Sequence, residues 1–317
     1  CRQIASFNPQ KLIILDNHEN SLYDIQNELL HKYPKLSIEA IVANIRERDR
    51  ICNIFEEYRP DVVFHAAAHK HVPLMEANPG EAVKNNVFGT LNVVECSDRF
   101  DIKKFVLVST DKAVNPTSIM GASKRIAEML VQAYNDNSDV RFSAVRFGNV
   151  LGSSGSVVPL FKKQIEWGGP VTVTHPDITR FFMTVTEAVQ LVIQSGAMAE
   201  GGEIFALDMG KPIRIYDLAC KLVRLSGFEP ETDIKIVFTG LRPGEKLHEE
   251  LLLDTEILYE TSNNKIFIAQ PVFRDLFELK SQMECLKQID TKNSGEIRKC
   301  IETIVPMMHS AQYAIKK

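Results

Sequence analysis

The sequence has 317 residues, of which 44% are hydrophobic and 25% are charged, and its formal net charge is −4. This length suits one large or two modest domains with a sizeable buried core. A slightly negative net charge gives no excess of basic residues for the phosphates of a nucleic acid, so we expect no nucleic-acid partner. No apolar run approaches the roughly 18 residues of a membrane span, and no signal peptide opens the chain.

Short apolar segments alternate with segments of helical spacing through the first half of the chain. This alternation predicts an α/β fold, a Rossmann-type doubly wound parallel sheet with right-handed crossovers. We expect Asn20 or Ser21 to cap the first long helix. The expected strands are 11–15, 36–42, 61–67, 105–108 and 140–147, and the expected helices are 21–33, 49–58, 82–100 and 120–132.

The pattern loosens after Val158 and predicts a smaller α/β unit that interleaves with the first. The expected helices are 157–167, 186–199, 215–226, 245–252, 277–289 and 294–304, and the expected strands are 170–174, 203–207 and 234–238. We assign 1–150 to a dinucleotide-binding domain to which 184–205 returns, and 151–183 with 206–317 to a substrate domain.

One element of a dinucleotide-binding fold is missing from the sequence. Such a sheet normally begins with a strand and a G-x-G-x-x-G turn, whose bare backbone lets a pyrophosphate reach a helix N-terminus. Nothing before Arg2 supplies them, although residues 1–6 read as the helix that follows this turn. The chain also lacks an initiator Met, so we expect it to be part of a longer protein whose first strand and glycine turn are absent here.

Six cysteines lie far apart and form no C-x-x-C pair. We therefore expect reduced thiols of a cytosolic protein, most of them filling the core. They are Cys1, Cys52, Cys96, Cys220, Cys285 and Cys300.

Polar side chains gather where the strand at 105–108 ends. Thr110, Asp111 and Lys112 follow that strand directly, at the edge where open α/β sheets bind ligands. Lys124 lies on the first turns of the next helix and can face the same pocket. A solvated polar loop is the alternative for an isolated Asp-Lys pair.

Asp16 follows a strand at the position where a carboxylate holds the adenosine ribose of NAD. No arginine is adjacent to hold a 2′-phosphate, so NAD is favoured over NADP; a helix-capping Asp is the alternative. The small residues Ala66, Ala67 and Ala68 allow either close approach of a flat cofactor or tight packing. The histidines around them lack a nearby carboxylate or thiol set, so we expect no metal.

The second half of the chain has two separate arginines, Arg180 in HPDITRFFM and Arg242 with Glu245 in GLRPGEK, and the chain has no basic surplus. This pattern suits a small dianion such as a nucleotide diphosphate, although structural salt bridges are the alternative. Asn149 ends a strand beside glycines and suits phosphate or ribose hydroxyls.

Several segments taken together resemble one known family. The chain is similar to the polysaccharide-biosynthesis (CapD-like) UDP-N-acetylglucosamine 4,6-dehydratases, which are extended short-chain dehydrogenase/reductases, over roughly residues 11–253. The matching segments, in family order, are HAAAHKHVPLMEANP, NNVFGTLNV, VSTDKAVNPTSIMGASKR, RFGNVLGSSGSVVPLF, HPDITRFFMTVTEA and GLRPGEKLHEELL.

The resemblance implies an internal redox reaction on UDP-N-acetylglucosamine. NAD takes a hydride from sugar C4, water is lost across C5 and C6, and the hydride returns to C6. Asp111 is then the acid at the C6 hydroxyl, Lys112 the base at C5, Thr110 their neighbour at the sugar, and Lys124 the ligand of the nicotinamide ribose. The other implied positions are Asn44, Ile45 and Asn85 for the cofactor and His71, Asn149, Arg180, Arg242 and Glu245 for the substrate.

The chain departs from the superfamily motif Y-x-x-x-K, which here begins with Met120 and ends with Lys124. A thioether cannot remove the C4 hydroxyl proton, so Thr110, Asp111 or Lys112 must help, or the protein is a silent NAD- or nucleotide-sugar-binding protein. A UDP-sugar 4-epimerase is the other enzyme alternative, but it needs the tyrosine.

Met at this position resembles the active, membrane-anchored branch of the dehydratases. The resemblance therefore implies transmembrane helices before this chain, a catalytic domain on the cytoplasmic face of the membrane, a homo-oligomer and retention of configuration at C5.

Overall fold

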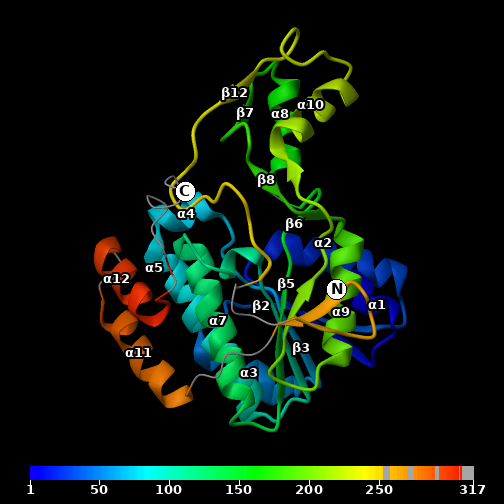
Figure 1. Ribbon diagram of the computed structural model, residues 1–317. Helices are drawn as coiled ribbons and strands as arrows, with labels where there is room; N and C mark the ends of the chain where they lie inside the picture. The colour runs from blue at the N-terminus through cyan, green and yellow to red at the C-terminus, as the bar shows by residue number, and fades with distance from the viewer. Residues whose placement is uncertain (154, 253–257, 270–274, 290–292, 307, 309–317) are drawn as a thin grey trace.

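The structure is a computed structural model, and it describes all residues except 154, 253–257, 270–274, 290–292, 307 and 309–317. A large α/β body carries a smaller lobe, which Figure 1 shows at the top. The lobe contains β7 (Val171–Val173), β12 (Ile236–Phe238), α8 (Val157–Glu166) and α10 (Ile215–Leu225).

The large body is built on a mostly parallel sheet, as predicted. Its spatial order is β13-β14-β10-β5-β4-β3; the last four strands run parallel, and β14 and β13 are antiparallel additions. The central strand is completely buried at 105–107, which explains its continuous apolar run. These strands are β3 (Val62–His65), β4 (Lys104–Val108), β5 (Arg141–Arg146), β10 (Ile204–Leu207), β13 (Leu258–Glu260) and β14 (Ile266–Ala269).

Two further strands, β1 (Lys11–Asp16) and β2 (Ser37–Val42), form a separate parallel pair. Among the described residues, β1 pairs only with β2 and β3 pairs only with β4, so each has one free edge. Both strands line one cavity of about 1510 Å³, together with residues of α3 (Arg48–Tyr58) and α9 (Val185–Met198). The sheet is thus interrupted beside β1, in accord with the predicted absence of a first strand.

Helix α7 (Ile119–Asn135) is buried along almost its whole length. The Ser118 side chain accepts a hydrogen bond from the Gly121 backbone N–H at 3.1 Å and so begins the helix. In Figure 1, α7 and the C-terminal helices α11 and α12 lie on one side of the sheet, and α9 lies on the other. Because α7 starts close to the end of β4, its first turns face the polar residues that follow that strand.

The remaining helices of the body surround this core. They are α1 (Arg2–Ser6), α2 (Glu19–Lys32), α4 (Val72–Ala77), α5 (Pro79–Ala82), α6 (Thr90–Arg99), α11 (Leu276–Gln288) and α12 (Ser294–Ile304). Short strands complete the lobe and its junction, namely β6 (Asn149–Val150), β8 (Thr179–Arg180), β9 (Phe182–Met183) and β11 (Ile213–Arg214).

Two local predictions were wrong. His18, rather than Asn20 or Ser21, caps α2, because its ring accepts the Ser21 N–H. The helix expected at 245–252 is an irregular segment with bends, and its polar side chains bind other segments: Lys246 Nζ donates to the Val114 carbonyl at 2.9 Å. The segment expected as a helix at 82–100 is helical, but Val83–Gly89 between α5 and α6 is a π-helix.

The C-terminal part of the chain packs on the large body. Strand β14 pairs with β10, and α11 and α12 contact α7. We expected all of 206–317 to belong to the second domain, but β14, α11 and α12 pack on the large body, so this boundary is corrected. The division of the chain into two domains stays a prediction. No helix of the described residues is long and apolar enough to cross a membrane.

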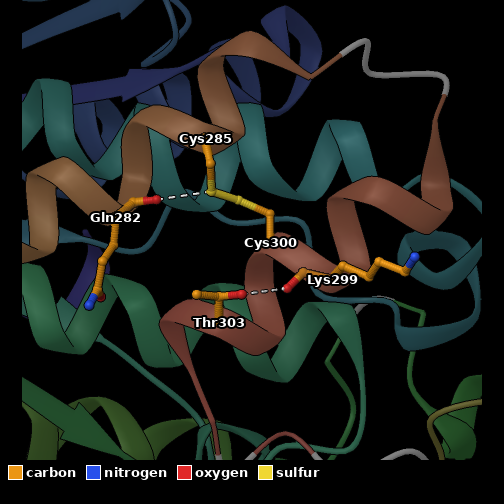
Figure 2. Close-up of a disulfide and its surroundings, with 5 residues drawn as sticks. All are labelled: Gln282, Cys285, Lys299, Cys300 and Thr303. Carbon is orange, nitrogen blue, oxygen red and sulfur yellow. Dashed lines mark hydrogen bonds between the residues drawn. A yellow bond between two sulfur atoms is a disulfide. The ribbon is translucent and has the colours of Figure 1, made fainter.

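A disulfide joins Cys285 on α11 to Cys300 on α12 (Figure 2). The expectation that all six cysteines are reduced thiols is therefore wrong for this pair. Its members lie on two different helices that pack together, so their spacing of 15 residues carried no pairing signal. Cys52 and Cys96 are buried free thiols, as expected of core residues.

Candidate active site

The polar residues after β4 form a hydrogen-bonded turn. Thr110 caps a 3₁₀ turn, Asp111–Ala113, and its hydroxyl donates to Asp111 Oδ1 at 2.8 Å. The backbone N–H of Asp111 donates to the Phe147 carbonyl at 3.1 Å, which ties this turn to the end of β5. The predicted cluster therefore has a fixed geometry, unlike the solvated loop that was its alternative.

Asp111 has no solvent exposure, yet its carboxylate is only half satisfied. Oδ1 accepts hydrogen bonds from Thr110 Oγ1 and from Lys112 Nζ, the latter at 3.0 Å. Among the described residues, Oδ2 is buried without a hydrogen-bond partner. Leaving such an oxygen unpaired costs about 1–3 kcal/mol, which a proton or a donor on a ligand would offset.

Lys112 lies between two carboxylates. Its Nζ is 3.0 Å from Asp111 Oδ1, 3.3 Å from Asn149 Oδ1 and 3.4 Å from Glu249 Oε1. Burial by itself lowers the pKa of this amine, but the Coulomb attraction of the two carboxylates outweighs burial and the opposing charge of Arg180, so the pKa is raised. Lys112 is therefore protonated here, and the predicted role as base at C5 requires prior loss of that proton.

A cavity of about 120 Å³ lies beside Lys112, at the junction of the body and the lobe. The predicted residues Lys112, Asn149, Arg180, Arg242 and Glu245 all line it. The sequence had not singled out the other lining residues, which are Val72, Pro73, Thr117, Ser118, Gly244, Lys246 and Glu249.

The two predicted arginines differ in how they are held. The Arg180 guanidinium is buried and donates to the carbonyls of Thr179 and Lys246 at 2.7 and 2.9 Å. These bonds fix the loop that carries Glu245 and Glu249. Arg242 is exposed. Its backbone N–H donates to Glu245 Oε2 at 3.1 Å, and its carbonyl accepts from the Glu245 N–H at 3.0 Å.

Lys124 is buried on α7, one turn after Met120. Burial lowers the pKa of its amine to about 8, although the Glu128 carboxylate partly opposes the shift. Glu128 itself accepts hydrogen bonds from Ser109, Arg125 and Arg146 in a buried network that the sequence did not reveal.

The predicted cofactor positions lie together around the large cavity. Asp16 is exposed at its margin and accepts the His18 backbone N–H at 2.8 Å, so it also organises the start of α2. Lys124 does not line this cavity. The lining residues that the sequence had proposed for NAD are Asp16, Asn44, Ile45, Ala66, Ala67, Ala68 and Asn85.

These residues fit the ribose and nicotinamide ends of a dinucleotide. Asp16 offers a carboxylate for ribose hydroxyls, and the alanines leave room for a flat ring. No glycine turn for the pyrophosphate occurs among the described residues, so the fit is partial.

Two histidines of the segment HAAAHKH, His65 and His71, do not line the small cavity. His65 Nε2 is 2.9 Å from Thr90 Oγ1, and burial lowers the pKa of this histidine to about 3. His71, predicted to bind substrate, lies against Gly155 and outside both cavities: a Cβ on Gly155 would be 2.7 Å from the imidazole. The described residues hold no cluster of three or more His, Cys, Asp or Glu side chains suited to a metal.

Glu249 is the main site residue that sequence reasoning missed. It lies in the segment GLRPGEKLHEELL, but a helix was expected there and no signal linked it to Lys112. Its carboxylate is buried, and Oε2 has no hydrogen-bond partner among the described residues.

The chain belongs to a family described as polysaccharide biosynthesis proteins, whose model matches residues 1–271. It is 57% identical over 269 residues to the capsular polysaccharide biosynthesis protein CapD of Staphylococcus aureus, a match that covers 84% of this chain and 45% of CapD. The chain thus spans about half the length of this relative. It is 35% identical to the UDP-N-acetylglucosamine 4,6-dehydratase (inverting) of Campylobacter jejuni, over 82% of this chain and 75% of that protein.

Solved structures confirm the Rossmann-type fold. Pen from Bacillus thuringiensis matches with a TM-score of 0.78 and 36% identity, covering 86% of this chain and 84% of Pen. DesIV, a dTDP-glucose 4,6-dehydratase from Streptomyces venezuelae with NAD and TYD bound, matches with a TM-score of 0.69 and 18% identity, covering 96% and 94% of the two chains.

Proposed function

We propose that this chain is the catalytic part of an NAD-dependent UDP-N-acetylglucosamine 4,6-dehydratase that serves the biosynthesis of a surface polysaccharide. The observation that carries the proposal is the Asp111–Lys112 pair, whose charged atoms lie 3.0 Å apart next to the small cavity. Elimination of water needs an acid and a base at neighbouring carbons, and this pair supplies both groups. The Campylobacter relative, named as such a dehydratase, supports the same activity.

NAD, when bound, would supply the redox chemistry, which is hydride transfer from sugar C4 and back to C6. Oxidation at C4 makes the C5 proton acidic, because the resulting carbanion is an enolate. In this chain, Asp16 and the alanines beside β3 would hold the cofactor, and Lys124 would bind its nicotinamide ribose. The solved DesIV structure, which contains NAD, supports this cofactor.

Thr110 and Asp111 can replace the missing tyrosine at C4. The Thr110 hydroxyl already donates to Asp111 Oδ1 at 2.8 Å. A proton taken from the C4 hydroxyl by Thr110 would therefore release the Thr110 proton to Asp111. Protonated Asp111 would then give this proton to the C6 hydroxyl, which departs as water. Lys112, after it has lost its own proton to solvent, would remove the C5 proton. The buried thioether of Met120 carries no proton in this scheme.

The UDP group would lie at Asn149, Arg242 and Glu245, which line the small cavity together. Arg180 would act through the loop that it holds. We also propose that the chain works as a homo-oligomer within a longer, membrane-anchored protein on the cytoplasmic face.

Incubation with UDP-N-acetylglucosamine and NAD in deuterated water tests the activity. We expect a 4-keto-6-deoxy sugar nucleotide that carries deuterium at C5, detected by mass spectrometry and NMR. A C4-inverted sugar without label at C5 would identify an epimerase instead. Binding of UDP-N-acetylglucosamine without any product would identify a silent binding protein.

A further inference from the structure

Glu249 contacts both basic groups of the small cavity. Its Oε1 is 3.4 Å from Lys112 Nζ and 3.6 Å from Arg180 Nε, and its side chain is only 2% exposed. The other oxygen, Oε2, is buried and has no hydrogen-bond partner among the described residues. A carboxylate that is removed from water in this way is stabilised only by the cations beside it.

The position of Glu249 is set by the loop rather than by a helix. Arg180 donates to the Lys246 carbonyl at 2.9 Å, and Lys246 Nζ donates to the Val114 carbonyl at 2.9 Å. These two bonds attach the loop to β8 on one side and to the segment after Lys112 on the other. The Glu249 carboxylate therefore faces Lys112 from the element opposite Asp111.

We propose that Glu249 is a positioning residue that fixes both the place and the charge of the Lys112 amine. Four polar groups surround this amine, and they come from four segments. Asp111 and Glu249 are anionic, Arg180 is cationic, and Asn149 is neutral. Glu245 reaches the cluster only through Arg180, at 3.5 Å.

Glu249 and Asp111 have different roles because they lie in different segments. Asp111 neighbours Lys112 in the sequence and keeps one oxygen free, as its proposed acid role needs. Glu249 belongs to the loop that carries the cavity residues Arg242 and Glu245, so the charge of Lys112 depends on the position of that loop. This extends the proposed function, because it adds a residue to the same site.

The pH dependence of Lys112 acylation tests the proposal without substrate or cofactor. Limited labelling of the protein with acetic anhydride over a range of pH, followed by mass spectrometry of the Lys112 peptide, gives the midpoint of amine deprotonation. Glu249→Gln keeps the shape and removes the charge, so the midpoint should fall by about one pH unit, the size expected for loss of a nearby opposite charge.

Glu250→Gln is the matched control, since Glu250 is exposed and bonds Lys246 and Asn115 instead. Its midpoint should equal that of the wild type. Should Glu249→Gln not fold, Glu249→Asp retains the charge and should keep the wild-type midpoint, with faster labelling if the amine is less well held. An unchanged midpoint in folded Glu249→Gln would overturn the proposal, and so would a fall of the same size in Glu250→Gln.

The same assay separates this proposal from the proposed function. A downward shift in a protein that releases no 4-keto sugar would support the role of Glu249 and refute the dehydratase. Where the enzyme is active, C5 deuterium exchange in Glu249→Gln should reach its plateau at lower pH than in the wild type. A merely structural role would reduce the exchange rate without moving that profile.

Discussion

Glu128 on α7 and Arg146 at the end of β5 form an ion pair from which water is fully excluded. Arg146 Nε donates to Glu128 Oε1 and Arg146 Nη2 donates to Glu128 Oε2, both at 2.8 Å. Ser109 and Arg125 donate to the same carboxylate, so it is well satisfied. This arrangement connects the end of the sheet to the helix that carries Met120 and Lys124.

Glu128→Gln should lower the free energy of unfolding by about 3–5 kcal/mol, because it removes the charge of the carboxylate bonded to the buried Arg146 guanidinium. Urea unfolding at pH 7 measures this loss. Glu28→Gln is the control, since Glu28 pairs with Arg2 at the surface, where water screens the pair, and should change stability little. Similar losses in both variants would mean that burial does not decide the strength of the pair.

The same pair predicts an acid limit of stability. Burial by itself raises the pKa of Glu128. The neighbouring cations, led by Arg146, outweigh burial, so the pKa falls from 4.5 to about 2. A depressed folded-state pKa stabilises the protein above pH 4.5, and this contribution is lost as the pH falls toward about 2. Melting temperatures of the wild type should fall across this window, and those of Glu128→Gln should fall less.

Lys124→Met should stabilise the protein at pH 7 while it weakens NAD binding. The folded state holds the amine with a pKa of about 8, compared with 10.5 in the unfolded chain, so folding expels a proton between these values. Wild-type stability should therefore rise with pH from 8 to 10.5, and that of Lys124→Met should not. We expect the variant to gain about 1–3 kcal/mol at pH 7.

Thermal melts over this pH range, with Lys162→Met on an exposed face of α8 as control, check the Lys124 prediction. If Lys124→Met and Lys162→Met show the same pH dependence, Lys124 is hydrated in the folded protein.

Gly121→Ala should destabilise the protein by about 1–3 kcal/mol, because a Cβ there would lie 2.2 Å from the Lys112 carbonyl oxygen. The clash would push the start of α7 away from the Lys112 turn. Gly295→Ala on α12 is the control: its nearest neighbour would be 3.8 Å away, so the better helix propensity of alanine should prevail there. Chemical denaturation of both variants measures these changes in stability. A Gly121→Ala variant as stable as the wild type would contradict the close packing of α7 against the Lys112 turn.

Arg242→Ala should weaken UDP binding by about tenfold to a hundredfold, the value of a charge-assisted hydrogen bond, and leave stability nearly unchanged. Its side chain is exposed, and within the part of the chain that the structure describes it bonds no other segment. Titration calorimetry with UDP measures the effect. Arg214→Ala, which removes an exposed arginine that pairs with Asp177 outside the small cavity, should bind UDP as the wild type does.

Asp16→Arg should reverse the preference for NAD over NADP, because a guanidinium in place of the carboxylate attracts a 2′-phosphate. Dissociation constants for both dinucleotides, measured by fluorescence, give the ratio. Asp24→Arg makes the same charge change on the exposed face of α2 and should leave the ratio at its wild-type value. Equal affinity of the wild type for the two cofactors would remove the basis of this prediction.

The sequence predicted the parts of the fold that local patterns determine. The apolar run at 105–108 could only be a buried strand, and the rule that ligands meet strand ends placed Asp111 and Lys112 in the site. The helix expected at 245–252 was wrong. The apolar spacing of this segment is typical of a helix, but Lys246 and Glu249 bind distant backbone and side-chain groups instead. The contact between Glu249 and Lys112 depends on that tertiary arrangement, and no single-sequence pattern encodes it.

The gap between β1 and β3 should affect how this chain, studied by itself, behaves with hydrophobic dyes. Leu12, Ile14 and Val63 line a hollow of about 1510 Å³, and within the described residues the facing edges of β1 and β3 have no strand partner. An anilinonaphthalene sulfonate probe usually reports a loosened core, but here it can enter the hollow of the folded chain and fluoresce without any unfolding. Open edges also template pairing with other chains, so dye fluorescence and turbidity should both increase with protein concentration while the circular dichroism stays native.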